Sequence, residues 1–292
     1  MARTRRWVIV TGAATGIAAM SGCTRLGTLN GVNSLTPGDA GTDRIADDIA
    51  YGRDPRQKLD IYAPAGARNA PVVVFFYGGS WNSGRRQDYA FAARALAAQG
   101  FVTVVPDYRL VPQVRYPGFV EDGAAAVAWT AQNIARYGGN PAEIGVSGHS
   151  AGAYIAMMLA MDGRWLASAG APGVIKAAVG LAGPYDFAPF VPGGAADMAF
   201  GASPDIRETQ PITHARAGAP PVLLLSGADD TTVLPRNADR LGAALQRLGS
   251  VAEVKVYPGI GHIGIILAVS KPFRGKAPVL DDSTGFFRRH LR

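Results

Sequence analysis

Residues 144–161 read IGVSGHSAGAYIAMMLAM, and this stretch decides how the rest of the chain is interpreted. The short run Ile144–Ser147 predicts a strand, and the apolar run Ala151–Met161 predicts a helix. Between them, Gly148–Gly152 has the pattern Gly-x-Ser-x-Gly, whose glycines let the strand and the helix approach closely. Ser150 is therefore expected on a sharp, exposed turn. The amino end of the following helix favours negative charge there, as a nucleophile requires.

Predicted strands and helices alternate along the chain from residue 46 onward. The predicted strands are Lys58–Ala63, which suits a sheet edge, Val72–Tyr77, Phe101–Val105, Ile144–Ser147, Ala177–Ala182, Val222–Ser226 and Ala252–Tyr257. The predicted helices are Gln87–Gln99, Phe119–Tyr137, Ala151–Met161 and Asn237–Leu248, and Gly285–Leu291 is expected to end a last helix. This alternation predicts one α/β domain over residues 46–292, with a mainly parallel twisted sheet and helices on both faces. The Pro- and Gly-rich segment 183–221 has no clear period and is expected to form a lid or a pocket wall.

A general base for Ser150 can be chosen among the four histidines by elimination. His149 adjoins the serine within the turn, so its side chain is expected to point elsewhere. His214 lies before the candidate acids, and His290 lies in a basic C-terminal run. His262 remains, on a glycine-rich loop after a predicted strand, where α/β sheets place their sites. Its imidazole is expected to take the serine proton and return it to the leaving group.

An acid that orients His262 is expected after the next-to-last strand. Asp229 and Asp230 both follow Val222–Ser226, and their spacing does not choose between them. One carboxylate would fix the imidazole tautomer, while the other would cap or solvate the loop. The order serine, acid, histidine is the chain order for a Gly-x-Ser-x-Gly turn of this type.

An anion-binding pocket of backbone N–H groups is expected beside the serine. Residues 76–81 read FYGGSW and follow the predicted strand Val72–Tyr77. Paired glycines there let backbone N–H groups face the cleft. Together with the N–H of Ala151 these groups would hold the oxyanion of a tetrahedral intermediate.

Taken together, these residues resemble the esterase–lipase branch of the α/β-hydrolase superfamily, over about residues 55–290. The nearest part is similar to small carboxylesterases, acetyl-xylan and feruloyl-type esterases and arylformamidases. That group carries H-G-G-x-W where this chain has Tyr77–Trp81. Further similar pieces are Asp107–Leu110, Tyr116–Pro117 leading into Glu121–Asp122, Gly148–Gly152 and Gly183–Asp186.

The resemblance implies an α/β-hydrolase fold and assigns further roles. Gly79 and Ser80 would supply oxyanion N–H groups, and the pattern Gly227-x-x-Asp230-x-x-Val233 selects Asp230 as the acid. Tyr77 replaces the group's histidine, which backbone donors can tolerate. The expected reaction is hydrolysis of a small-molecule short-chain or aryl ester through an acyl-enzyme on Ser150.

Two other functions remain open alternatives at this point. One is an arylformamidase-type amide hydrolase, and the other is a non-catalytic envelope lipoprotein that keeps the scaffold for binding. No metal-binding cluster or cofactor loop is evident in the sequence. The segment Thr11–Ile17 resembles the glycine-rich turn of dehydrogenases, but it lacks the strand and helix that such a turn needs.

The N-terminus has the pattern of an export signal. Residues 1–22 hold three arginines and no acid, followed by an uncharged, mostly apolar stretch that is short for a membrane span. Met20–Cys23 resembles a bacterial lipobox, so lipidation of Cys23, the sole cysteine, is expected, with plain cleavage as the alternative. Residues 23–45 would then be a flexible spacer. The chain is expected in the cell envelope, attached to a membrane by its lipid, or in the periplasm.

The charge of the chain does not favour nucleic acid as a partner. The formal net charge is +7, and removal of the three leader arginines would lower it to +4. The remaining basic residues are scattered, without a basic stripe or a reader motif, so no nucleic-acid binding is expected.

Overall fold

The computed structural model describes residues 22–291, and of residues 22–28 it describes the backbone alone. Within this part, eight strands form one sheet in the order β1-β2-β4-β3-β5-β6-β7-β8. They are β1 (Thr42–Ala50), β2 (Lys58–Pro64), β3 (Ala70–Phe76), β4 (Val102–Pro106), β5 (Gly139–His149), β6 (Ile175–Leu181), β7 (Val222–Gly227) and β8 (Ala252–Tyr257). β2 runs antiparallel to both β1 and β4, and all other neighbours are parallel. The predicted mainly parallel sheet is confirmed.

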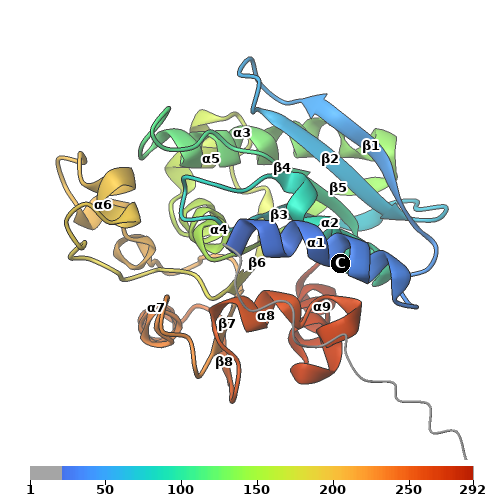
Figure 1. Ribbon diagram of the computed structural model, residues 1–292. Coiled ribbons are helices and arrows are strands. Elements are labelled where there is room, and N and C mark those ends of the chain that lie inside the picture. The colour runs from blue at the N-terminus through green and yellow to red at the C-terminus, as the bar shows by residue number, and fades with distance from the viewer. Residues whose placement is uncertain (1–21, 292) are drawn as a thin grey trace, which may run out of the picture.

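Helices cover both faces of this sheet (Figure 1). The α-helices are α1 (Gly22–Leu35), α2 (Ala90–Ala98), α3 (Gly118–Asn133), α4 (Ala151–Met161), α5 (Gly163–Ser168), α6 (Ala195–Phe200), α7 (Arg236–Arg247), α8 (His262–Leu267) and α9 (Val279–His290). Short 3-10 turns lie at Arg86–Tyr89 (η1), Ile134–Tyr137 (η2), Arg207–Thr209 (η3), Pro211–His214 (η4) and Lys271–Lys276 (η5).

Close contacts at glycines show which helix lies on which face. A Cβ at Gly145 of β5 would meet the ring of Phe287 in α9 at 2.5 Å. A Cβ at Gly123 of α3 would meet Ile155 of α4 at 2.6 Å and Phe76 of β3 at 3.4 Å. Phe76 pairs with Gly148, three residues beyond Gly145, so the two positions point to opposite faces of the pleat. α9 and the pair α3/α4 therefore lie on opposite sides.

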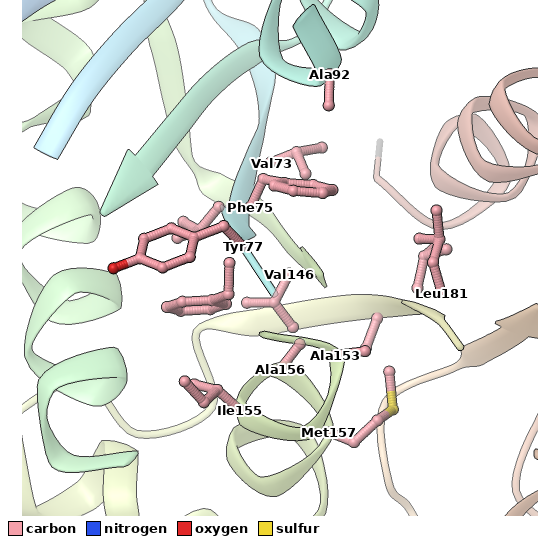
Figure 2. Close-up of a cluster of buried hydrophobic side chains, with 14 of the residues drawn as sticks. Val73, Phe75, Tyr77, Ala92, Val146, Ala153, Ile155, Ala156, Met157 and Leu181 are labelled. Atoms are coloured by element: carbon pink, nitrogen blue, oxygen red, sulfur yellow. The ribbon is translucent and has the colours of Figure 1, made fainter. Parts of the chain in front are cut away.

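Figure 2 shows the part of the hydrophobic core where side chains of β3, β5 and α4 pack together. Val72, Val73 and Val74 are fully buried, as expected for a parallel strand covered on both faces. Every residue of α4 is buried as well, so this helix is apolar all round. The rigid strand and helix on either side of Ser150 thus hold that turn in place.

The predicted edge strand Lys58–Ala63 is in fact internal. β1 pairs with it along its outer side, and five of the seven residues of β2 are buried. β1 itself is mostly exposed and contains three acids, which is why its sequence, TDRIADDIA, gave no strand signal. The exposed edge of the sheet is therefore charged, a common protection against pairing with other chains.

The predicted flexible spacer over residues 23–45 differs from the structure, which has α1 and the start of β1 there. Leu29 is buried, and the Asn30 side chain accepts from the N–H of Phe91 and donates to the carbonyl of Gln87. The N–H of Lys271 donates to the Asn33 side chain. The side-chain amides of Asn30 and Asn33 thus hold this segment against the rest of the domain by hydrogen bonds to its backbone. The composition of residues 23–45 gives no indication of these bonds.

The predicted export signal falls on residues 1–21 and Gly22, almost wholly outside the described residues. Cys23 lies in α1, but its side chain is outside the description too. Lipidation of Cys23 therefore stays a prediction, and loss of membrane association in a Cys23→Ser variant would test it. Across residues 22–291, no helix is both long and apolar enough to span a membrane.

Candidate active site

Ser150 sits on a strained turn between β5 and α4. Its φ is 54° and its ψ is −121°, a conformation that L-residues rarely adopt. Its N–H donates to the carbonyl of Leu181 at 2.9 Å, which ties the turn to β6. A Cβ at Gly152 would lie 2.1 Å from the carbonyl oxygen of Phe76, and one at Gly148 would lie 2.4 Å from Gly152. Glycine at both positions is thus a steric requirement of the turn.

Hydrogen bonds join Ser150, His262 and Asp230 in one chain. The Nε2 atom of His262 lies 2.9 Å from the Oγ of Ser150, and its Nδ1 lies 2.8 Å from Oδ2 of Asp230. An ionised carboxylate can only accept, so Nδ1 carries the proton and Nε2 is left to accept from the serine hydroxyl. The sequence placed His262 on a loop, whereas it is the first residue of α8.

The structure brings Asp230, and not Asp229, to the imidazole. Oδ1 of Asp230 accepts from the N–H groups of Thr232 and Val233 at 2.9 and 2.8 Å, and the side chain is fully buried. Burial by itself would raise the pKa of Asp230, but the hydrogen bonds from His262 and Val233 outweigh it and lower this pKa. Asp229 is exposed, and its N–H donates to the carbonyl of Ile260.

Three backbone N–H groups, those of Gly79, Ser80 and Ala151, have no protein acceptor within residues 22–291. Gly79, Ser80 and Trp81 have φ values of 141°, 51° and 59°, so the loop after β3 is consecutively left-handed. Within residues 22–291, the N–H groups of Gly79 and Ser80 donate to no protein atom. Ala151 is the first residue of α4, so its N–H has no partner within the helix. All three groups are thus available to an anion, and Ser80 lines the same pocket as Ser150.

Tyr77 connects this loop to neighbouring residues by ring stacking and hydrogen bonds. Its ring stacks on Tyr108, with centroids 4.6 Å apart, and Tyr108 donates its hydroxyl to the Tyr77 carbonyl at 2.8 Å. One Arg56 nitrogen donates to the Tyr77 hydroxyl at 2.8 Å and to the Gly84 carbonyl at 2.9 Å. A stacked, hydrogen-bonded phenol therefore occupies the place where the resembling esterases carry histidine.

His149 is part of the site, although its sequence position suggested otherwise. Its Nε2 lies 3.0 Å from the backbone carbonyl of His262, and its Nδ1 lies 3.0 Å from the Tyr89 hydroxyl. A carbonyl only accepts, so Nε2–H donates, and Nδ1 accepts from Tyr89. His149 is 1% exposed, and the bond fixes the backbone that carries His262. The sequence does contain an indication of this role. His149 is a polar residue at the end of a strand of small and apolar residues, and a buried polar side chain needs hydrogen-bond partners.

Replacing His149 with glutamine is expected to flatten the dependence of stability on acid pH. Burial, followed by the nearby His262, lowers the pKa of His149 from 6.5 to about 3. A depressed pKa means that the unfolded chain binds a proton below pH 6.5 while the folded protein does not. Stability is therefore lost as pH falls, by about 2 kcal/mol at pH 5.

The measurement is the free energy of unfolding in urea at pH 7.5 and pH 5. The wild type is expected to lose about 2 kcal/mol more than His149→Gln between these values. Equal losses in both proteins would contradict a buried neutral His149.

A cavity of about 450 Å³ opens beside Ser150. The predicted lid or pocket-wall segment contributes Pro184, Phe187, Pro189 and Phe190 to its lining. Trp81 lies beneath, stacked on Phe187 with centroids 6.0 Å apart. The part of this segment between residues 184 and 196 therefore forms a wall of the pocket. The residues that the structure describes contain no group of three or more His, Cys, Asp or Glu placed to hold a metal ion.

Comparison with known proteins places the chain among esterases. A family model described as BD-FAE matches residues 59–245. Esterase LipC of Mycobacterium tuberculosis is 33% identical over 239 residues, covering 73% of this chain and 58% of LipC. Isoprenylcysteine alpha-carbonyl methylesterase ICME of Arabidopsis thaliana is 30% identical over 264 residues, covering 80% of this chain and 60% of that protein. The chain thus spans little more than half the length of these curated relatives.

Solved structures agree on the fold. A truncated carbohydrate esterase from gut microbiota superposes with a TM-score of 0.75 at 20% identity, covering 87% of this chain and 98% of the other. Apo esterase 2 of Thermogutta terrifontis gives 0.72 at 23% identity, covering 87% and 96%. Together with the strand order, these matches confirm the fold that the sequence predicted.

Proposed function

The chain belongs to the BD-FAE family of α/β-hydrolase esterases, and on that premise we propose that it hydrolyses carboxylic esters through an acyl-enzyme on Ser150. One observation carries the proposal. The buried carboxylate of Asp230, the imidazole of His262 and the hydroxyl of Ser150 are in hydrogen-bond contact, beside free backbone N–H groups and an open cavity. This set of groups is what acyl transfer to water needs.

The proposed reaction has two halves with the same proton carrier. Ser150 Oγ attacks the ester carbonyl while His262 Nε2 takes its proton, and the tetrahedral oxyanion is held by the N–H groups of Gly79, Ser80 and Ala151. The alcohol leaves with the proton from His262, and the acyl group stays on Ser150. Water then attacks the acyl-enzyme and loses its proton to His262. The bond between the acyl carbon and Ser150 Oγ breaks, the carboxylic acid leaves, and His262 returns the proton to Oγ. Asp230 stabilises the imidazolium in both halves.

The pocket supports a short-chain or aryl ester as the substrate. About 450 Å³ is enough for a small molecule, and the wall from segment 183–221 is mostly apolar. The relatives named above are esterases by their descriptions, which fits carboxylic ester hydrolysis without fixing the acid or the alcohol.

Labelling with a fluorophosphonate probe tests the proposal. The wild type is expected to label, and Ser150→Ala is expected not to, because the probe bonds to an activated serine oxygen. Ser80→Ala is the matched control, since Ser80 lines the same pocket but is proposed to act through its backbone N–H. Equal labelling of wild type and Ser150→Ala, or no labelling of either, would refute the proposal.

A further inference from the structure

We propose that the substrate carries a carboxylate, which Arg236 binds within the pocket beside Ser150. This inference rests on the proposed esterase function and names the class of ester that the site favours. It starts from the charge of the pocket lining. Of the described residues that line the cavity, Arg236 is the one with a charged side chain.

The cavity has two walls of different chemistry. One wall is apolar and includes Phe187, Phe190 and Val191. The other is formed by the segment after Asp230, where Thr231, Thr232 and Arg236 offer hydroxyl and guanidinium groups. A molecule that fits both walls has an apolar or aromatic body and a polar group that accepts hydrogen bonds.

Arg236 has no protein counter-ion among the described residues, whereas Arg240 on the same helix has one. Arg240, one turn further along α7, is paired with Asp186 at 2.7 Å. Asp197, in α6 opposite, accepts from the N–H of Gly193 at 2.9 Å. Within residues 22–291, no acidic oxygen lies within 4.0 Å of the Arg236 guanidinium. Its donors are therefore free to bind a ligand.

The position of Arg236 is not explained by the stability of its helix. It is the first residue of α7, where the helix macrodipole disfavours a cation. Asp239, one turn on, makes no ion pair with it, and Asp229, exposed on the preceding loop, does not line the cavity. An unpaired guanidinium on a residue that lines the cavity is suited to recognition of a ligand.

A carboxylate is the anion that matches this arrangement. The planar guanidinium donates two parallel hydrogen bonds to a carboxylate, and the neighbouring threonine hydroxyls can donate to the same group. The substrate class is thus an ester whose apolar body carries a carboxylate away from the scissile bond. Because Arg236 is exposed to water, the attraction is screened, and we expect a preference of about five- to tenfold.

Isosteric ester pairs test this on the full chain. The first pair is 3-carboxyphenyl acetate and 3-carbamoylphenyl acetate, with the charge on the alcohol side. The second is monoethyl glutarate and ethyl glutaramate, with the charge on the acyl side. The measurement is kcat/KM for the wild type, Arg236→Gln and the control Arg240→Gln, in low salt and in high salt.

The expected result is a carboxylate-to-amide ratio in kcat/KM that falls about five- to tenfold in Arg236→Gln for at least one pair. Arg240→Gln keeps the ratio, and high salt lowers it in the wild type. The inference is overturned if this ratio is unchanged in Arg236→Gln for both pairs, including the case in which kcat/KM falls equally for both esters of a pair. If the wild type hydrolyses neither of the two neutral esters, which carry a carboxamide in place of the carboxylate, the proposed esterase function is refuted instead. The two failures are therefore distinguishable.

Discussion

Replacing Ser150 with alanine is expected to lower kcat for a neutral aryl acetate by about four to six orders of magnitude. The change removes the oxygen that forms the acyl bond, while His262 and Asp230 keep their hydrogen bond at 2.8 Å. The residual rate would come from attack by a water molecule that His262 activates, with the oxyanion held by the N–H groups beside residue 150. KM is expected to change little, because the cavity wall is untouched.

The measurement is steady-state hydrolysis of 3-carbamoylphenyl acetate by purified variant and wild type. Ser80→Ala is the control and is expected to stay within about threefold of the wild type, since its backbone N–H is retained. The midpoint of thermal unfolding shows whether Ser150→Ala is folded. A folded Ser150→Ala protein with more than about one per cent of wild-type kcat would contradict the assignment of the nucleophile.

Replacing Asp230 with asparagine is expected to lower kcat by about three to four orders of magnitude. The Oδ1 atom can still accept from Thr232 and Val233, so the loop is expected to stay in place. The amide N–H₂, however, now faces Nδ1 of His262 as a donor. This favours the tautomer with the proton on Nε2, which cannot take a proton from Ser150.

Asp229→Asn is the matched control, because it makes the same chemical change one residue away. Asp229 is exposed and its backbone N–H, which is retained, makes the bond to Ile260. Its kcat is expected within about threefold of the wild type. The assignment of the acid fails if Asp229→Asn loses as much activity as Asp230→Asn, or if Asp230→Asn keeps most of its kcat while folded.

Local sequence patterns predicted part of the candidate site, the nucleophile and the base, but not the acid. The turn at Ser150 could be predicted because it needs glycine on both sides, and this requirement lies within five residues. A Cβ at Gly148 or Gly152 would clash with backbone atoms. His262 was reached by elimination among four histidines, since its place after a strand was the decisive feature. The choice between Asp229 and Asp230 could not be made from local spacing. It depends on which carboxylate the loop turns inward, and the family resemblance selected the residue that the structure places there.

The sequence by itself determined the alternation of strands and helices, the mainly parallel sheet and the strained turn that exposes Ser150. These follow from side-chain periodicity and backbone sterics between near neighbours. Only the tertiary structure decided that β1 covers β2, that Asn30 and Asn33 fasten α1, and that His149 bonds to the backbone of His262. β1 and β2 are neighbours in the sequence, but the contacts of Asn30, Asn33 and His149 join residues 61, 238 and 113 positions apart. A hydrogen bond between such partners forms only when the whole sheet has brought them together, and no local pattern records it.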